Sequence, residues 1–314
     1  MFNASIQEFL DTKKRLANYF DDDLNEDIFD YIPPQKTNQI FTPKSVVKIM
    51  VDTLERENPD IFKDSNKTFI DLYAKSGIFL TEITKRLFKG LKNEIPNEGE
   101  RLKHILENQV YGVAPTNIIY NIAKEYIYSN FDNISADNLV ECDLTIYAEK
   151  DSLAEKLTEL YGGKNVKFDV VIGNPPYQEE DGGAQASARP VYHHFVQAAK
   201  SLNPEYISYI TPSRWFVGGK GLDSFRDEML NDLHLKEIHD WLTPEYIFPN
   251  TNIRGGVNYF LWDKNFTDKS VRFASYKDGK KISDVIRPLA IEGIDILLRD
   301  NIGIKVLEKI YAND

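Results

Sequence analysis

Four consecutive residues, Asn174, Pro175, Pro176 and Tyr177, directly follow a mostly apolar stretch at residues 168–172. A residue that precedes proline is held in an extended conformation, and each proline ring fixes its own φ and removes one backbone donor. The apolar stretch predicts a buried strand, so the four residues are expected to form a rigid turn at its end. This turn presents two hydrogen-bond acceptors, the side-chain oxygen of Asn174 and the carbonyl oxygen of Pro175.

Two adjacent acceptors suit a planar amine with two N–H groups, such as the exocyclic amine of adenine or a side-chain amide. The nitrogen lone pair of such a group is delocalised, so the amine is a poor nucleophile. Hydrogen bonds to Asn174 and Pro175 would favour a pyramidal nitrogen and direct its lone pair toward an electrophilic methyl group. Tyr177 would offer a stacking face for a base. The alternative interpretation is structural, a proline-rich loop with a buried asparagine cap.

The elements that position this turn follow from the alternation of apolar runs and helical spacing along the chain. Short apolar runs at 68–72, 110–113 and 139–141 predict strands, and the spacing predicts one helix that starts near Gly77 and another over 119–126. Strands that alternate with helices build a mostly parallel sheet with helices on both faces. Ligands bind such sheets at the carboxyl ends of the strands, which is where the Asn-Pro-Pro-Tyr turn is expected.

The chain after the turn has a different pattern. A helix is expected over 195–202, and strands are expected over 206–210, 235–241, 257–262 and 271–276. Because the last two strands bracket a short loop, the sequence predicts that they pair in antiparallel fashion. The small, polar and Gly-rich segment 181–190 is expected to be a mobile loop, and it is the candidate for a lid.

The N-terminal part has two features of its own. Residues 1–40 carry apolar side chains at roughly helical spacing, interrupted by an acidic run and by Pro33-Pro34, and predict a helical appendage. Thr42 is expected to be the N-cap of the next helix, with Pro43 in its first turn.

Composition limits the class of protein. The chain has 314 residues, of which 42% are hydrophobic, and its longest apolar runs are far too short for a membrane helix. The single cysteine, Cys142, excludes an internal disulfide and a cysteine-based zinc site, and His104, His193 and His194 lack the spacing of metal ligands. We therefore expect a cytoplasmic protein without a membrane partner or a metal site.

The net charge of -11 has the wrong sign for a protein whose whole surface binds nucleic acid. If DNA is a partner, the basic surface that binds it must therefore be local or lie outside this chain. Four basic residues among Gly-rich loops and aromatics could line a DNA groove, although ordinary surface charge explains them equally well; they are Arg189, Arg214, Lys220 and Arg254.

The Asn-Pro-Pro-Tyr motif after a hydrophobic strand resembles the catalytic motif of the N6-adenine DNA methyltransferases that use S-adenosylmethionine. Over roughly residues 41–263 the chain is similar to the methylase part of Eco57I-like type II restriction-modification proteins, with the motif order of the group called gamma. The resemblance implies an α/β, Rossmann-like methyltransferase fold with an antiparallel pair near the C-terminal end. It also implies methyl transfer from S-adenosylmethionine to N6 of a flipped adenine in DNA, as the modification part of a restriction-modification system. DNA is then a partner, and a restriction or specificity subunit or domain is a further candidate.

The resemblance also implies roles for individual residues. The catalytic positions are Asn174, Pro175, Pro176 and Tyr177. The cofactor-binding positions are Phe41, Thr42 and Pro43, then Asp71, Ala74, Ser76 and Gly77 in the loop after the first strand, and Asp143 after the third. Backbone N–H groups of a tight turn that opens a helix can bind a carboxylate or a ribose, and a strand-terminal carboxylate can accept hydrogens from an amine or hydroxyl. Asp71 and Asp143 as helix caps, and Phe41 as a core residue, are the alternatives.

Two positions depart from the family pattern. Lys75 stands where the family loop usually has its first glycine, which bears on any close approach of the backbone there. Ala114, Pro115 and Thr116 follow the second strand, where the family usually places an acid that holds the ribose hydroxyls.

The resemblance divides the chain into the helical appendage 1–40, a methyltransferase catalytic domain 41–265 and an incomplete target-recognition region that starts in 266–314. Two other hypotheses remain open from the residues alone. One is a methyltransferase with the same turn that acts on protein glutamine or on a guanine amine in RNA. The other is a degenerate, non-catalytic methylase fold that binds DNA or a partner, which draws on Lys75 and on the missing ribose acid.

Overall fold

The computed structural model forms two compact units. The first unit comprises Met1–Pro176 and His194–Pro204, and the second comprises Tyr177–His193 and Glu205–Asp314. The structure describes residues 15, 18–21, 41–164, 166–179, 188–249, 251, 253–301 and 303–304. Most of the predicted N-terminal appendage therefore lies outside the described residues. Of the residues described there, Tyr19 is buried, and its ring centroid lies 5.9 Å from that of Tyr126.

The first unit is built on four parallel strands in the order β3-β2-β1-β4. Their bounds are Phe69–Asp71 for β1, Val110–Ala114 for β2, Leu139–Glu141 for β3 and Val170–Gly173 for β4. The register pairs Asp71 with Gly112, and Ala114 with Glu141. Because the strands are parallel, all four carboxyl ends lie at the same edge of this sheet. The four strands predicted from the apolar runs are thus confirmed to within two or three residues.

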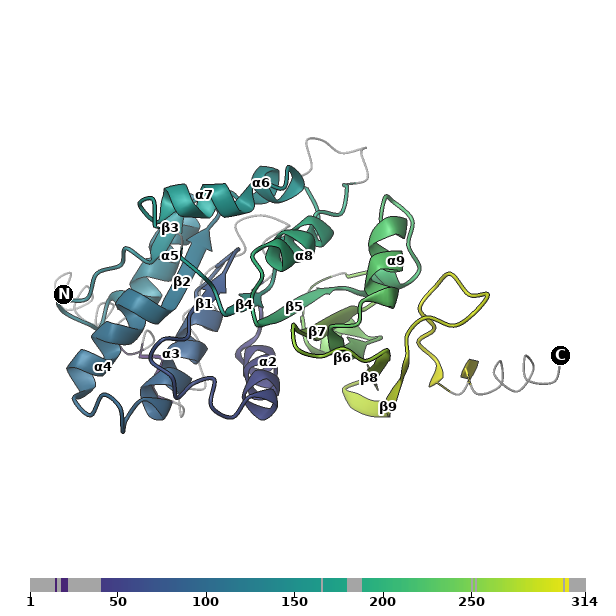
Figure 1. Cartoon of the computed structure of the whole chain (residues 1–314), viewed down its shortest axis with the longest axis horizontal. Coiled ribbons are helices and arrows are strands. Elements are labelled where there is room, and N and C mark those ends of the chain that lie inside the picture. Colours follow the sequence, from purple (N-terminus) through teal and green to yellow (C-terminus); the bar gives the residue numbers. More distant parts are fainter. Residues whose placement is uncertain are drawn as a thin grey trace, which may run out of the picture. The chain divides into compact units, whose positions relative to one another are not determined.

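Helices pack against both faces of this sheet (Figure 1). In the figure α6 and α7 lie above the strands, and α2 and α3 lie below them. Three apolar side chains of α2, Val47, Met50 and Leu54, are fully buried, as their spacing predicts. The helical segments of the unit are α2 (Lys44–Glu57), α3 (Ile78–Gly90), α4 (Glu98–His104), the π-helical turn η2 (Ile105–Gln109), α5 (Asn117–Tyr128), α6 (Thr145–Glu149), α7 (Leu153–Leu160) and α8 (Tyr192–Ser201), which begins in the second unit.

The second unit contains five strands in the order β5-β7-β6-β8-β9. These are β5 (Tyr206–Pro212), β6 (Leu235–Trp241), β7 (Val257–Asp263), β8 (Ser270–Lys277) and β9 (Lys280–Pro288), with the short helical segments η3 (Ser213–Phe216), α9 (Asp223–Asn231) and η4 (Pro244–Tyr246) between them. β7 is antiparallel to both β5 and β6, whereas β6 and β8 are parallel. The mostly parallel sheet of the first unit and these antiparallel strands match the predicted fold class.

One predicted pairing is wrong. The strands at 257–263 and 270–277 do not pair with each other, because β6 lies between them and pairs with both. The antiparallel hairpin near the C-terminal end is instead β8 with β9, joined at Asp278 and Gly279, whose φ values are 49° and 72°. Two consecutive residues with positive φ are typical of the type I′ turn, for which Asp-Gly is a preferred sequence. The Asp-Gly dipeptide was thus a readable signal for this hairpin.

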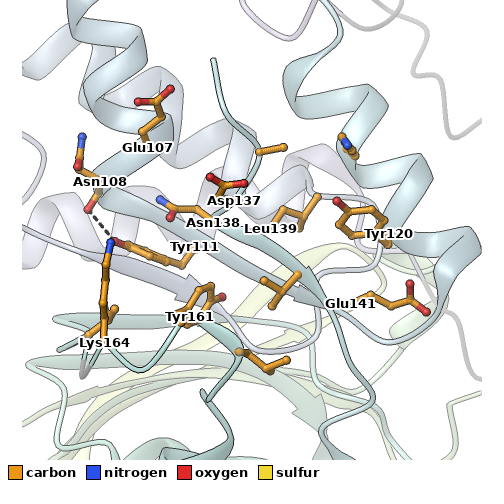
Figure 2. Close-up of a pocket in the computed structure, with 16 residues that line it drawn as sticks. Glu107, Asn108, Tyr111, Tyr120, Asp137, Asn138, Leu139, Glu141, Tyr161 and Lys164 are labelled. Atoms are coloured by element: carbon orange, nitrogen blue, oxygen red, sulfur yellow. Dashed lines mark hydrogen bonds between the residues drawn. The ribbon is translucent and has the colours of Figure 1, made fainter. Parts of the chain in front are cut away.

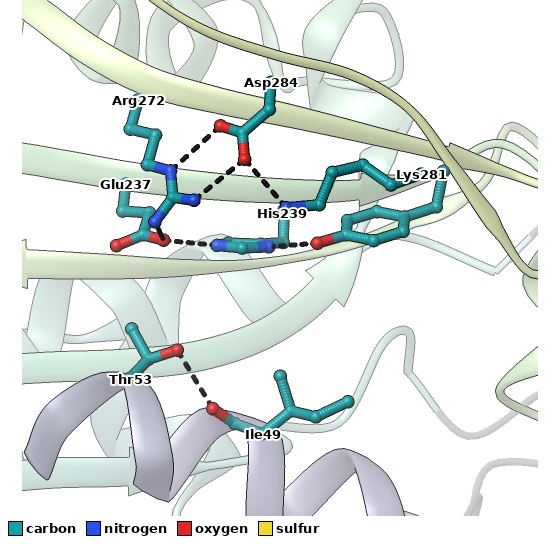
Figure 3. A network of polar contacts seen from close by, with 8 residues as sticks. Ile49, Thr53, Glu237, His239, Arg272, Lys281 and Asp284 are labelled. Carbon is teal, nitrogen blue, oxygen red and sulfur yellow. Dashed lines mark hydrogen bonds and ion pairs between the residues drawn. The ribbon is translucent and has the colours of Figure 1, made fainter. Parts of the chain in front are cut away.

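Charged side chains connect β6, β8 and β9 (Figure 3). Arg272 of β8 donates hydrogen bonds to Glu237 of β6 at 3.0 Å and to Asp284 of β9 at 2.8 and 2.9 Å. Hydrogen bonds from Arg272, and then from Lys281, hold the pKa of Asp284 well below its usual range. Since Arg272 bonds to both neighbours, it ties the two outer strands to β6. Within the described ranges, no helix combines the length and apolar character needed to cross a membrane.

Candidate active site

Asn174 follows the last residue of β4 and is almost completely buried, with 2% of its surface exposed. Its side-chain Nδ2 donates a hydrogen bond of 2.9 Å to the hydroxyl oxygen of Thr42, a residue 132 positions earlier in the chain. With the nitrogen of the amide directed to Thr42, the oxygen of the same planar amide points to the opposite side of the Cβ–Cγ axis. The segment that leads into α2 therefore sets the orientation of the candidate catalytic amide.

Thr42 does not have the role of helix cap that its sequence context predicts. The N-cap of α2 is Pro43, which makes no side-chain cap, and the amides of Val46 and Val47 donate to the carbonyl oxygen of Pro43. The Thr42 side chain, 5% exposed, is instead used to hold Asn174. Thus the structure brings the Phe41-Thr42-Pro43 segment to the Asn-Pro-Pro turn, although not through the predicted cap.

Asp71 is the last residue of β1 and lies against Gly173 of the neighbouring strand β4. It is 3% exposed, and its Oδ1 accepts a hydrogen bond of 3.0 Å from the backbone amide of Tyr73. A Cβ atom added to Gly173 would lie only 2.5 Å from that same Oδ1. The glycine before Asn174 is therefore needed for space, because any side chain there would displace the Asp71 carboxylate.

The turn between β1 and α3 is held at both ends. The amide of Ala74 donates to the carbonyl oxygen of Val113 on β2 at 2.9 Å, and the hydroxyl of Ser76 accepts from the amide of Ile78 at 3.4 Å. Gly77 caps α3 in the left-handed region with φ of 79°, and a Cβ there would meet Ile127 of α5 at 2.7 Å. This turn places the N-terminus of α3 at the carboxyl end of β1, as the sequence predicts.

The burial of Lys75 is a feature of the site that was not predicted from the sequence. The side chain is buried, with 6% of the residue exposed, and its Nζ lies 5.7 Å from the centroid of the Tyr73 ring. Burial lowers the pKa of Lys75 to about 7, an effect that the negative charge of Asp71 opposes. Burial likewise raises the pKa of Asp71 to about 7, against the opposing effects of the Tyr73 amide and of Lys75. The family glycine is thus replaced by the cationic member of a buried pair.

The ends of β2 and β3 show a different arrangement from the one expected. Asp143 is exposed, and its Oδ1 accepts from the amide of Thr145 at 3.0 Å, which is the geometry of a local cap at the start of α6. At the end of β2, where the sequence has no acid, Asn117 donates a hydrogen bond of 2.9 Å to Glu141 of β3. An acidic side chain therefore does lie beside the end of β2, supplied by the neighbouring strand. Only the strand register reveals it.

Tyr177 belongs to the second unit, because the division of the chain falls between Pro176 and Tyr177. Its carbonyl oxygen accepts from the amide of Val191 at 3.3 Å, and the amide of Glu179 donates to the carbonyl oxygen of Arg189 at 2.9 Å. Arg189 also forms an ion pair of 2.6 Å with Glu179. These contacts join the two ends of the predicted lid, whereas residues 181–187 of it lie outside the described residues.

Of the four basic residues expected near DNA, Arg189 is thus bound to a carboxylate, and Arg214 and Arg254 line one cavity of about 260 Å³ in the second unit. The neighbouring aromatics Trp215 and Phe216 are buried and belong to the core.

A larger cavity, of about 710 Å³, lies beside β3 in the first unit (Figure 2). It is lined by residues such as Tyr111, Tyr161 and Glu141, not by Asp71 or Asn174.

With this geometry established, comparison with known proteins identifies the central segment. Residues 108–248 match the Eco57I restriction-modification methylase family. This segment contains the Asn-Pro-Pro-Tyr turn, and the family resemblance expected from the sequence is therefore confirmed. A Mycoplasma pneumoniae protein named uncharacterized adenine-specific methylase is 24% identical over 316 residues, which cover 82% of this chain and 75% of that protein. Together these matches support a DNA adenine methyltransferase of the restriction-modification type.

Solved structures of the same class share the fold at low sequence identity. The DrdV–DNA complex matches with a TM-score of 0.59 and 16% identity, over 90% of this chain and 33% of that one. The methyltransferase subunit of a type I restriction-modification system from Streptococcus thermophilus matches with a TM-score of 0.53 and 16% identity, over 89% of this chain and 54% of that one. The chain thus spans about a third to a half of the length of these solved chains. At such identity the likeness shows the fold alone, and it confirms the predicted methyltransferase fold class.

Proposed function

We propose that this chain transfers a methyl group from S-adenosylmethionine to N6 of an adenine flipped out of duplex DNA. The observation that carries the proposal is the hydrogen bond from the amide nitrogen of Asn174 to Thr42. It leaves the amide oxygen as the group that can accept a hydrogen from a substrate amine, next in sequence to the carbonyl of Pro175. Two acceptors for one NH2 group favour a pyramidal nitrogen, which is the transition-state geometry of methyl transfer.

The residues of the first unit suit S-adenosylmethionine by their chemistry. The methionine part of this cofactor carries an ammonium and a carboxylate, and the buried Asp71 and Lys75 would carry the opposite charges when each is ionised. The turn at Ala74, Ser76 and Gly77 leads into a helix N-terminus, where backbone amides favour an anionic or hydroxyl ligand. The other residues proposed to hold the cofactor are Phe41, Thr42, Pro43 and Asp143. When bound, S-adenosylmethionine supplies an electrophilic methyl group on a sulfonium centre.

The role of this chain's own residues is to orient and to exclude water. Asn174 and Pro175 would hold the amine, while Tyr177 would stack on the extruded base, an interaction worth on the order of 1–3 kcal/mol. Pro175 and Pro176 keep the turn rigid, since neither can donate a hydrogen bond or change φ. The target-recognition function is proposed for residues that begin in 266–314, and a restriction or specificity subunit is proposed as a partner.

Replacing the amide tests the proposal. Asn174→Ala should abolish the appearance of N6-methyladenine in unmethylated DNA incubated with S-adenosylmethionine, as measured by mass spectrometry of the digested nucleosides. Asn138→Ala is the matched control, because Asn138 is also a largely buried asparagine of the first unit, bonded to the carbonyl oxygen of Leu106. It differs from Asn174 in that it precedes β3, which is three strands away from β4 in the sheet. The control should keep its methylation rate within about threefold.

Three outcomes would contradict the proposal. Turnover by Asn174→Ala close to that of the unaltered protein would remove the assigned role of the amide. Methylation of protein glutamine or RNA guanine, with none of DNA, would assign the same turn to a different substrate. Failure of the intact, folded chain to bind S-adenosylhomocysteine in calorimetric titration would point to a non-catalytic binding fold.

A further inference from the structure

The cavity of about 260 Å³ in the second unit has an unusual concentration of positive charge. Arg214, Arg254 and Arg299 are among the residues that line it, and none of the described residues that line it is acidic. The chain as a whole carries a net charge of -11, so three arginines among the residues that line one small cavity are unexpected for this composition. This concentration marks the cavity as a candidate site for an anion.

Arg299 already has a partner. It binds the carboxylate of Asp240 with two hydrogen bonds of 2.6 and 2.7 Å and donates a third, of 2.7 Å, to the carbonyl oxygen of Gly255. Asp240 is fully buried near the end of β6 and also accepts a hydrogen bond of 2.6 Å from Ser213. The charges of Arg299 and Asp240 therefore cancel, and the pair forms a rigid wall of the cavity.

Arg214 and Arg254 differ from Arg299 because neither forms an ion pair or a side-chain hydrogen bond with any residue that the structure describes. Both are exposed, and both are among the residues that line the same cavity. Two like charges in one cavity repel each other unless an anion lies between them. A guanidinium group is planar and donates two parallel hydrogen bonds, which matches the oxygens of a phosphate.

The rest of the cavity suits a sugar–phosphate backbone better than a free ion. Val217, at its rim, is 57% exposed, which places an apolar surface beside the cations. Gly218 and Gly255, which also line the cavity, have φ values of 74° and 91°. These two positions contribute no side chain that would obstruct an extended ligand.

We propose that Arg214 and Arg254 bind one phosphate of the DNA backbone in this cavity, and that Arg299, held by Asp240, positions the segment that carries Arg254. This inference rests on the proposed function, because it takes DNA as the source of the phosphate. A phosphate contact positions the duplex and carries no sequence information. The contribution of the two arginines to binding should therefore be the same whatever the sequence of the duplex.

The salt dependence of DNA binding tests this site. Binding of a fluorescent 30-base-pair duplex of arbitrary sequence to the full chain is measured by anisotropy from about 0.05 to 0.4 M KCl, for Arg214→Gln, Arg254→Gln and the double variant. The double change should reduce the slope of log K against log salt by about 1, because the one phosphate that the two arginines neutralise together contributes about 0.9 to the slope, and each single change should reduce it by part of that amount. At 0.1 M salt the double change should weaken binding about eightfold.

Lys269→Gln is the matched control, because Lys269 is an exposed cation in the loop after β7, whereas Arg254 precedes that strand. It should leave the slope unchanged, and Arg214→Lys should keep most of it. The inference is overturned if the arginine variants keep the slope of the control, or if their loss depends on the sequence of the duplex. Should the unaltered chain neither bind duplex DNA nor methylate it, the proposed function itself fails, and this inference with it.

Discussion

The hydrogen bond between Thr42 and Asn174 allows a test of how the candidate catalytic amide is oriented. Thr42→Val has nearly the same shape as threonine but lacks the hydroxyl that accepts from Nδ2 at 2.9 Å. Both residues are at most 5% exposed, so water does not readily replace the lost acceptor. The amide must then either keep a buried, unpaired N–H group or change its orientation.

The magnitude follows from the cost of these two outcomes. A buried donor without a partner costs about 1–3 kcal/mol, which is the expected loss in the free energy of unfolding. An amide free to rotate no longer keeps its oxygen toward the substrate amine. Losing one such acceptor in the transition state costs a similar free energy, and at about 1.4 kcal/mol per factor of ten the kcat should fall roughly ten- to hundredfold.

The assay is kcat for N6-methyladenine formation at saturating cofactor, with the Kd for S-adenosylhomocysteine measured separately, so that a change in binding is not mistaken for a change in rate. Thr42→Ser retains the hydroxyl and should stay within about threefold of the unaltered enzyme. Thr53→Val is the control for stability. Thr53 is also buried and donates a hydrogen bond of 2.9 Å to the carbonyl oxygen of Ile49 within α2 (Figure 3). It should lose stability but keep kcat.

The reasoning would be refuted by a Thr42→Val enzyme whose kcat is within twofold of normal. It would also be refuted if Thr42→Ser lost as much activity as Thr42→Val, because the hydroxyl would then not be the decisive group. An equal loss of kcat in Thr53→Val would assign the effect to general destabilisation of α2.

Three further changes have definite expected results. Arg299→Met leaves the Asp240 carboxylate buried without its partner, so urea denaturation should show a loss of about 3–5 kcal/mol in the free energy of unfolding. The double variant that also carries Asp240→Asn should lose less than the sum of the losses of the two single variants. Lys75→Met removes a group whose pKa is lowered to about 7 in the folded chain. The free energy of unfolding of the unaltered chain should rise from about pH 7 to pH 10, and in urea titrations at different pH values this rise should be absent from Lys75→Met. The sign follows because between these pH values the unfolded lysine binds a proton that the folded one does not. Gly173→Ala would place a methyl group 2.5 Å from Asp71 and should cost about 1–3 kcal/mol by the same denaturation measurement, whereas Asp71→Ala in the same chain should recover part of it.

Much of the fold was predictable because its signals are local. The buried strand at 170–173 is an uninterrupted apolar run, and helix α5 begins at the cap that Thr116 provides for the amide of Ile119. The strand at 280–288 was missed because it lies at an edge of the second-unit sheet and most of its side chains are exposed. An edge strand of this kind has no apolar run to reveal it, and only the Asp278-Gly279 turn signals it.

The candidate site also combines residues that have a local signal in the sequence with contacts that depend on tertiary packing. Asn174 and Asp71 are visible in the sequence because each directly follows or ends an apolar strand, and their roles stay predictions. The contact of Asn174 with Thr42 joins positions 132 residues apart, and no local pattern encodes it. The burial of Lys75 also depends on tertiary packing, since a lysine in a loop is usually exposed. What the sequence lacks is therefore the set of contacts that orient the groups, not the groups themselves.

The charge of the chain sets a limit on how it can bind DNA. The one phosphate neutralised by Arg214 and Arg254 would strengthen binding at 0.1 M salt by only about eightfold relative to 1 M salt. Specific binding typically exceeds non-specific binding by a factor of about 10³–10⁷, which one such contact cannot supply. The remaining affinity has to come from contacts to base edges and from other basic surface, which in an assembly can be provided by a recognition region or a partner subunit. The chain by itself should consequently bind duplex DNA weakly, and its affinity should rise steeply when such a partner is added at constant salt.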